Sequence, residues 1–375
     1  MIKILHCADL HLDSPLSMLD ISRAESRRRD LCAALTSLTL SVKSNAVDFL
    51  LIAGDLFDGA FVSRDTVALL CHEFASIPDC RVIIAPGNHD PYTFSSYYRL
   101  AELPENVYVF DSPEVKYFDF PDKNATVYGW AFTSDSLESC PLDGFEVMSR
   151  SRINLLVAHG ELNVSESKYC PIPMDTLASC GFDYAALGHR HTHDGVEPCG
   201  GGYVAYSGCL EGRGFDECGI KGAVLAAADK GDKLQFAAKF IRFCKRYYEI
   251  ADCDVSGAKS NADVLDKLTE LIKDGHYGDD TALRVRLIGN VSGDFKLSTS
   301  FLGEQFPNIY RLELIDATSP LADGDRLRDD PTLRGAYYRS LEGMLTSEDE
   351  SEREIAAMAL RYGLAALAGN DIADE

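Results

Sequence analysis

The sequence predicts an α/β layered core followed by a smaller α+β unit. Apolar runs of strand length occur at residues 2–7, 49–53, 82–85 and 153–158, as expected for strands that are buried on both faces. Helical patterns at 23–46 and 64–75 separate the first three runs, and the first pattern is carried by Leu31, Leu35, Leu38 and Val42. This alternation of strand and helix favours an α/β core.

The remaining elements follow in order along the chain. The first domain, 1–240, is predicted to add strands at 107–110, 115–120, 126–131, 202–206, 222–228 and 236–243. An α+β domain, 241–345, is predicted to hold strands at 248–251, 282–288 and 309–315 and a helix at 262–273 capped by Asn261. A helical tail, 346–375, opens on a capping-box pattern at Ser347 and is predicted to run as helix to about Leu367.

Composition narrows the class of protein. The 375 residues carry 36 Lys and Arg against 59 Asp and Glu, a net charge of −23, so a nucleic-acid partner requires a basic patch, metal ions or a helper subunit. The sequence has no apolar run long enough to span a membrane and no signal-peptide pattern, which predicts a soluble, cytoplasmic protein. The twelve cysteines form no C-x-x-C pair. We interpret them as reduced thiols that fill apolar space, with thiolate metal binding as the alternative.

Polar blocks follow five predicted strands, where open α/β sheets place their ligand sites. Taken singly, each block could be an ordinary loop or turn. Their order and shared location instead indicate a two-metal site. The blocks are Asp9-Leu10-His11, Gly54-Asp55-Leu56-Phe57-Asp58, Gly87-Asn88-His89-Asp90, His159-Gly160-Glu161 and Gly188-His189-Arg190-His191.

This ordered set resembles the signature of the calcineurin-like metallophosphoesterases. The runs 11–15 and 54–59 further resemble the DNA-repair exonuclease branch, which holds SbcD-like and YhaO-like proteins, and the segments 206–208 and 219–222 are similar to the end of that branch's catalytic core. The resemblance covers roughly residues 1–240 and implies a two-sheet α/β sandwich with a capping domain. One departure is Asp58, which stands where archaeal and eukaryotic relatives carry a histidine.

The resemblance also implies the roles of the site residues. Asp9, His11, Asp55 and His191 would hold one metal, and Asp55, Asn88, His159 and His189 the other, with Asp55 as the bridge. Ligands of this nitrogen and oxygen type suit Mn²⁺, Fe or Zn²⁺, and the branch implies Mn²⁺. Two such ions can supply much of what phosphodiester hydrolysis needs.

Other polar residues near the blocks have open interpretations. His89 would act as general acid, and Asp90 could either orient His89 or cap a turn. His6, His72, His193 and His276 are predicted to be ordinary core or surface histidines, although His193 could line the cleft. The basic residues Arg27, Arg28, Arg29, Arg64, Arg190 and Arg213 could form a DNA track, with solvated helix faces an equal alternative for 27–29.

The leading functional hypothesis is therefore a metal-dependent DNA exonuclease in DNA end processing and repair. The resemblance implies an SMC-like coiled-coil ATPase partner of the SbcC or YhaN type and a possible homodimer. The helical tail would dock on that partner or pack on its own capping domain. Two alternatives remain open: a phosphatase or phosphodiesterase acting on small molecules or proteins, and a catalytically inactive scaffold of the same fold.

Overall fold

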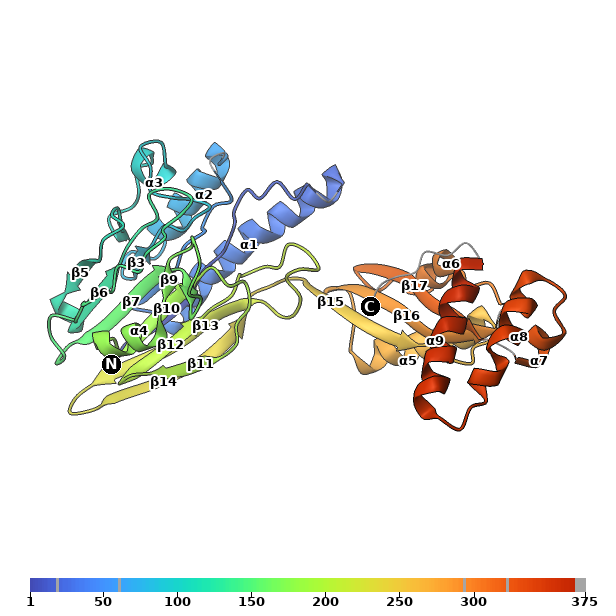
Figure 1. The fold of residues 1–375 in the computed structure, drawn as a ribbon. Helices are drawn as coiled ribbons and strands as arrows, with labels where there is room; N and C mark the ends of the chain where they lie inside the picture. Colours follow the sequence, from blue (N-terminus) through green and yellow to red (C-terminus); the bar gives the residue numbers. More distant parts are fainter. Residues whose placement is uncertain (18–19, 60–61, 293–294, 322–323, 368–375) are drawn as a thin grey trace. The chain divides into compact units, whose positions relative to one another are not determined.

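The computed structural model describes residues 1–17, 20–59, 62–292, 295–321 and 324–367. The chain divides into two compact units, Met1–Tyr247 and Tyr248–Glu375 (Figure 1). No helix among the described residues is long and apolar enough to cross a membrane.

Two six-stranded sheets form the first unit. The first has the order β14 (Leu234–Arg242), β13 (Gly222–Lys230), β1 (Ile2–Cys7), β2 (Phe49–Ile52), β3 (Arg81–Ile84) and β4 (Val107–Val109). The second has the order β11 (Val196–Cys199), β12 (Gly202–Tyr206), β10 (Tyr184–Gly188), β7 (Ile153–His159), β6 (Ala125–Gly129) and β5 (Lys116–Phe120). β1 to β4 run parallel in one sheet, and β6, β7, β10 and β12 run parallel in the other. β8 (Glu161–Leu162) and β9 (Pro171–Ile172) form a small separate pair.

The two sheets pack face to face, and helices cover their outer faces. On β2, Phe49 and Leu51 lie in the core between the sheets, whereas Leu50 and Ile52 face the helices, as the two-residue period of a strand requires. The outer helices are α1 (Ile21–Asn45), α2 (Arg64–Ala75) and α4 (Met174–Cys180), and shorter turns form α3 (Tyr97–Leu100) and η1 (Pro121–Lys123). The predicted α/β sandwich is confirmed.

His6 and Arg27 are buried titratable side chains of the first unit. Tyr184 Oη donates to Nδ1 of His6 at 2.8 Å, and Nε2 of His6 lies 3.2 Å from the carbonyl oxygen of Leu187. Burial lowers the pKa of His6 to about 3, so His6 is a core histidine, one of the two kinds predicted for it. Arg27 pairs with Asp30 at 2.9 Å and with Glu211 at 2.8 Å. Both predicted roles for Arg27, a solvated helix face and a DNA contact, are therefore wrong.

The second unit joins a three-stranded sheet to helices. The strands are β15 (Tyr247–Asp254), β16 (Thr281–Ser292) and β17 (Arg311–Leu321), and the helices are α5 (Asn261–Asp274), α6 (Thr299–Glu304), α7 (Gly324–Asp329), α8 (Leu333–Leu345) and α9 (Glu350–Leu367). α9 packs on α8, and its Leu360 and Leu364 form a small core with Tyr338 of α8 and Leu327 of α7. The last residues of the predicted tail, 368–375, lie outside the described part of the chain.

Two predicted helix caps in this unit are wrong by a few residues. Ser260, not Asn261, caps α5: its side chain accepts from the Asp263 N–H, and the Asp263 carboxylate accepts from the Ser260 N–H. At α9 the carboxylate of Asp349 accepts from the Ser351 N–H, whereas Ser347, three residues before the helix, donates its hydroxyl to the Glu352 side chain. In both places the cap belongs to the polar residue directly before the first helical residue, and neighbouring polar residues in the sequence obscure which one that is.

Candidate metal centre

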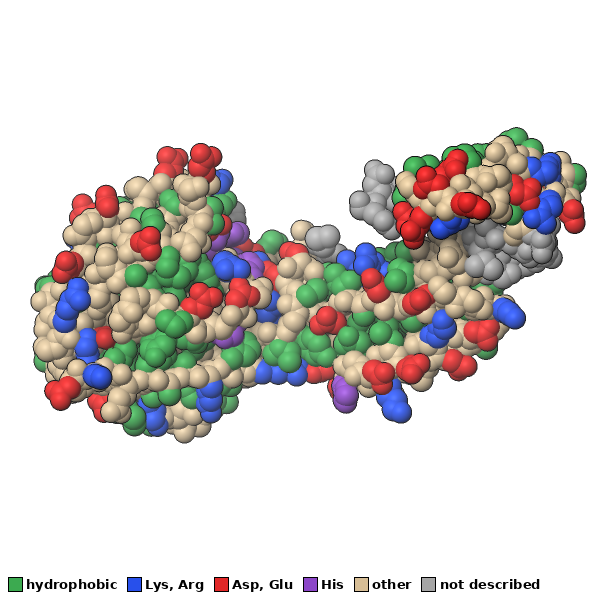
Figure 2. Space-filling model, turned by 60° about the horizontal axis from the view of Figure 1, so that its bottom comes forward, with side chains coloured by type: hydrophobic (Ala, Val, Ile, Leu, Met, Phe, Trp, Pro, Cys, Tyr) green, Lys and Arg blue, Asp and Glu red, His purple; other side chains and the backbone are tan. Residues whose placement is uncertain are grey.

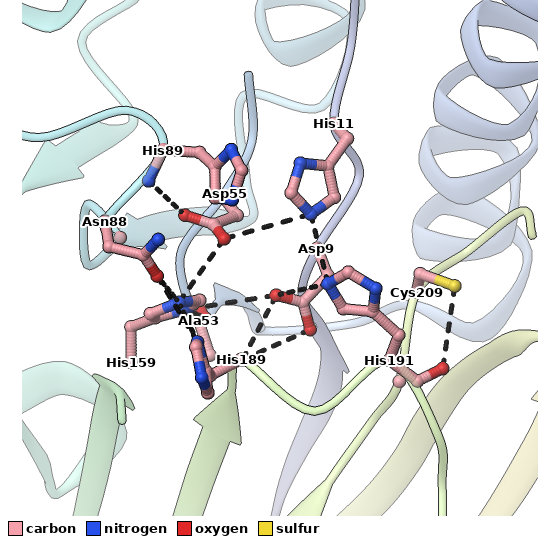
Figure 3. Close-up of polar contacts among 12 residues, drawn as sticks. Asp9, His11, Ala53, Asp55, Asn88, His89, His159, His189, His191 and Cys209 are labelled. Atoms are coloured by element: carbon pink, nitrogen blue, oxygen red, sulfur yellow. Dashed lines mark hydrogen bonds and ion pairs between the residues drawn. The ribbon is translucent and has the colours of Figure 1, made fainter. Parts of the chain in front are cut away.

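The five polar blocks meet at one edge of the sandwich. β1, β2 and β3 are adjacent parallel strands of the first sheet, and β7 and β10 are adjacent parallel strands of the second. Their carboxyl ends therefore open on the same side, and the polar side chains stand at or just after these ends. They are Asp9 and His11 after β1, Asp55 after β2, Asn88 after β3, His159 at the end of β7, and His189 and His191 after β10. In Figure 3 these side chains point toward one another around a common centre, and Figure 2 shows histidine side chains reaching the surface of the first unit among acidic and basic ones.

The backbone at this edge is held in unusual conformations. Asp9, His11, Asp55 and His189 all have positive φ, at 52°, 46°, 49° and 101°, although they are not glycines. Backbone strain of this kind is found most often at functional sites. Close packing adds a second constraint, because a Cβ on Gly87 would collide with the Asp55 carboxylate.

Hydrogen-bond acceptors converge in the first half of the site. Nδ1 of His159 lies 3.0 Å from the carbonyl oxygen of Ala53 and donates to it, which leaves Nε2 without a proton. That Nε2 nevertheless lies 3.0 Å from Oδ1 of Asn88, 3.3 Å from Nδ1 of His189 and 3.4 Å from Oδ2 of Asp55. Donor atoms gathered at these distances can share one cation.

The second half of the site has the same character. Nε2 of His11 lies 3.2 Å from Nε2 of His191. Nδ1 of His191 is bonded to Oε1 of Glu217 at 2.7 Å, and Nδ1 of His11 lies 3.3 Å from Oδ1 of Asp58, a charge contact rather than a well-aligned hydrogen bond. The two Nε2 atoms face each other while each Nδ1 is turned toward a carboxylate, an arrangement that suits two ligands of one metal ion.

Asp55 lies between the two halves. Its Oδ2 is 3.4 Å from Nε2 of His159 in the first half and 3.8 Å from Nε2 of His11 in the second. Its Oδ1 accepts from the backbone N–H of His89 at 2.9 Å, which fixes the carboxylate. An ion in either half could therefore be reached by this carboxylate. Asp9, buried beside it, lies 3.9 Å from His159 and 4.0 Å from His191.

Each histidine of the centre has a partner for its outer nitrogen. The partners are Asp58 for His11, the Ala53 carbonyl for His159, Glu161 at 3.3 Å for His189 and Glu217 for His191. Metal-binding histidines are oriented in this way in known metalloproteins. The inner nitrogens are thereby assigned as Nε2 of His11, His159 and His191 and Nδ1 of His189.

Three of the four histidines of the centre are held neutral. Burial lowers the pKa of His11, His159 and His189, and neutral rings are what metal binding requires. Burial also acts to lower the pKa of His191, but Glu217 and Asp9 outweigh it, and the pKa of His191 is raised. Burial also raises the pKa of Asp9. Burial acts in the same sense on Asp55, but His159, His11 and His89 outweigh it and lower the pKa of that carboxyl. A group of Asp9, His11 and His191 and one of Asp9, Asp55 and His159 each place their donor atoms within 4.8 Å of one another.

His89 lies beside the centre and is paired with Asp58. Its Nδ1 is 2.9 Å from Oδ1 of Asp58, and 46% of its side chain is exposed. Because Asp58 bonds to the ring, the pKa of His89 is raised. Nε2 is then the nitrogen that can meet a substrate. His11, Asp58 and His89 also have one donor atom each, and these three atoms lie within 4.8 Å of one another. Metal binding by His89 is therefore the alternative to proton donation, and an experiment must distinguish the two.

Of the two roles predicted for Asp90, the contacts fit the turn cap and not the orienting of His89. The Asp90 carboxylate accepts from the backbone N–H groups of Leu56 and Gly87, at 2.7 and 2.8 Å, and from Tyr98 Oη at 2.5 Å. Asp90 therefore ties the loop after β2 to the loop after β3, and Asp58 is the residue that orients His89. Burial raises the pKa of Asp90 to about 7.

Several other predictions are settled by position. His193 bonds to the Tyr206 carbonyl at 2.6 Å and stacks on Phe240, so its ring is occupied in packing. The twelve cysteines are all free thiols, and the candidate metal groups found among the described residues contain no cysteine. Glu161 belongs to a predicted polar block but was given no role, and Arg213 was predicted only as part of a DNA track. Glu217 was not predicted, because only the fold brings it to His191.

The sequence is similar to known proteins. Residues 2–193 match the family model described as calcineurin-like phosphoesterase. The chain is 32% identical over 269 residues to a Bacillus subtilis protein described as "Uncharacterized metallophosphoesterase YhaO". That match covers 69% of this chain and 64% of the relative, just under two thirds of its length.

Solved structures give more distant matches. A dimetal phosphatase from Danio rerio superposes with a TM-score of 0.40 at 12% identity, covering 64% of this chain and 99% of that one. The protein TT1561 of Thermus thermophilus superposes with a TM-score of 0.38 at 12% identity, covering 63% of this chain and 98% of that one.

Proposed function

Because this chain belongs to the calcineurin-like phosphoesterase family, we propose that it is a two-metal DNA exonuclease of DNA end processing. The observation that carries the two-metal part is the position of Asp55, whose Oδ2 faces a ligand histidine on each side. The sequence runs 11–15 and 54–59 support the narrower assignment to DNA, since they resemble the DNA-repair exonuclease branch.

The donor set fits two divalent ions, which we propose to be Mn²⁺. One would be held by Asp9, His11, Asp55 and His191, and the other by Asp55, Asn88, His159 and His189. When bound, two such ions neutralise phosphoryl oxygens and make a nucleophile available at neutral pH. Neutral imidazole, carboxylate and amide donors without thiolate suit Mn²⁺, Fe or Zn²⁺.

His89 supplies the proton in this proposal. Asp58 holds Nδ1 of His89 and raises the pKa of the ring, so the protonated form persists toward neutral pH. Nε2 then donates a proton to the oxygen that leaves phosphorus, which is the role of a general acid. Asp55 is kept in place by the His89 backbone N–H, so the acid and the bridging ligand are held by one loop.

Two proposed partners, DNA and a coiled-coil ATPase, are argued from the net charge of the chain and from the exposed face of α9. A chain of net charge −23 depends on local positive charge to hold DNA, and the two ions supply some of it. α9 presents Ile355 and Met358, 59% and 54% exposed, on a face away from its buried Leu360. We propose that this face binds an SMC-like coiled-coil ATPase and that the chain works in the cytoplasm, which its free thiols suit. A homodimer is part of the same proposal.

One assay separates the candidate activities. Purified chain with Mn²⁺ is given linear duplex DNA, a nucleotide monoester and a cyclic nucleotide, with Asp55→Ala as the control for contaminating nucleases. The proposal predicts metal-dependent loss of the linear DNA that the variant lacks. Hydrolysis of only the small substrates would make the chain a phosphatase or phosphodiesterase, and no hydrolysis of any substrate would favour the inactive scaffold.

A further inference from the structure

Arg213 joins two carboxylates that each hold a histidine of the centre. Its Nη2 and Nε lie 2.8 and 3.1 Å from Oε1 of Glu217, and its backbone N–H donates to Oε2 of Glu217 at 2.7 Å. Its Nη1 lies 3.2 Å from Oδ2 of Asp58. The same Glu217 Oε1 bonds to Nδ1 of His191, and Asp58 contacts His11 and His89. One guanidinium thus connects the supports of three histidines.

These contacts occupy the side chain of Arg213. Only 20% of it is exposed, and Glu217 is buried. Arginine suits this position because its planar group can donate to two carboxylates at once, which a lysine ammonium cannot do with the same geometry. The suggestion that Arg213 forms part of a DNA track is therefore replaced by a role inside the protein.

The contacts reach only one of the two halves of the centre. The supports tied to Arg213 belong to His11 and His191, whose Nε2 atoms face each other. In the other half, His159 is held by the Ala53 carbonyl and His189 by Glu161. The two halves therefore depend on different supporting groups.

We propose that Arg213 and Glu217 are positioning residues that set the affinity of one metal position, the one formed by Asp9, His11 and His191. The affinity of the other metal position depends on Glu161 instead. This inference rests on the two-metal centre of the proposed function. Loss of an outer partner of a metal-binding histidine costs about 10–100-fold in metal affinity. This factor applies to Glu217, the direct partner of His191. Arg213→Ala leaves Glu217 and Asp58 without the guanidinium that holds them in place, so the affinity at that position should fall by up to the same factor.

The test is a calorimetric titration of the metal-free full-length chain with Mn²⁺ alone, without DNA. Two ions should bind to the wild type. Arg213→Ala and Glu217→Gln should each keep one ion at wild-type affinity and bind the second about 10–100-fold more weakly. Asp216→Asn is the matched control, since it removes an exposed carboxylate one position from Glu217 on the same loop and should bind both ions as the wild type does.

Reciprocal variants identify which ion is weakened. Glu161→Gln should also weaken one ion, and combining it with Arg213→Ala should weaken both, because the two changes act on different positions. A double variant that still keeps one ion at full affinity would overturn the assignment to separate halves. Arg213→Lys keeps the charge but contacts one carboxylate at a time, so it should remain weaker than wild type. Full affinity in Arg213→Lys would overturn the bridging role.

The result is independent of the substrate. A wild type that binds two Mn²⁺ but leaves DNA intact contradicts the exonuclease proposal, and the affinities still decide the role of Arg213. Equal weakening of both ions in Arg213→Ala, with a lowered melting temperature, would show a general structural role and overturn the inference.

Discussion

Replacing His89 by Asn separates a proton donor from a metal ligand. The structure predicts that both ions stay bound, because the inner donor atoms assigned to the centre come from other side chains. The backbone N–H of His89, which holds Asp55, is also kept by the substitution. The chemical step should still slow by about 10²–10⁴-fold, the usual contribution of a positioned general acid.

The contact with Asp58 refines this magnitude. A hydrogen bond to a charged group contributes about 1.5–3 kcal/mol, which corresponds to roughly 10–100-fold in rate at 1.36 kcal/mol per factor of ten. If the 2.9 Å contact between Asp58 and His89 contributes to catalysis by supporting His89, Asp58→Asn should slow the chemical step by about 10–100-fold. Asp58 also contacts His11, so the comparison is made at saturating Mn²⁺. The double variant should then be no slower than His89→Asn alone, because the second change removes support from a group that is already absent.

The assay compares two leaving groups in single-turnover reactions. DNA releases a poor leaving group that needs a proton, whereas bis-nitrophenyl phosphate releases a nitrophenolate that needs little help. His89→Asn should therefore lose more rate on DNA than on the nitrophenyl ester, with metal content measured on the same sample. Equal loss on both substrates would refute the general-acid role, and loss of an ion would make His89 a ligand.

Three further predictions address the bridge, the tail and the buried histidine. Asp55→Ala should remove both ions or leave one weakly bound, which elemental analysis of the purified variant measures; two ions at normal affinity would show that Asp55 is no bridge. Ile355→Asp with Met358→Asp should reduce co-purification with a coiled-coil ATPase and leave the melting temperature unchanged, with Ala357→Asp on the same helix as control; unchanged co-purification would refute docking through this face. The pKa of His6, about 3 when folded against 6.5 unfolded, means that only the unfolded state takes up this proton between those values. Wild type should therefore lose about 1.4 kcal/mol of stability per pH unit relative to His6→Gln as the pH falls from 6.5 toward 3. Urea unfolding of both proteins at several pH values measures this, and a free energy of unfolding that falls equally with pH in both would contradict it.

The sandwich could be predicted from the sequence because its signals are local. Strands such as β2 and β7 are short apolar runs that are buried on both faces, and each polar block follows its strand directly. In the second unit the first residues of the helices were harder to predict. Ser260 and Asn261 are both good capping residues, and only the backbone geometry shows that Ser260 is the cap.

The supporting groups of the centre could not be predicted because the contacts that define them are distant in sequence. Asp58 meets Arg213, and Asp90 meets Leu56 across two loops. Neither pairing leaves a spacing pattern. Arg27 shows the same limit, since its helical position is compatible with solvent but its side chain is enclosed with Glu211. Ligand positions follow strands, whereas their supports depend on how loops fold against one another.

The exonuclease proposal is tested most directly by DNA ends. Wild type and Asp55→Ala are incubated with Mn²⁺ and the same duplex as a linear molecule and as a covalently closed circle. We predict that wild type shortens the linear DNA progressively from its ends, leaves the circle intact and loses this activity in Asp55→Ala. Linear DNA that stays intact with two Mn²⁺ bound to the wild type would contradict the proposed function.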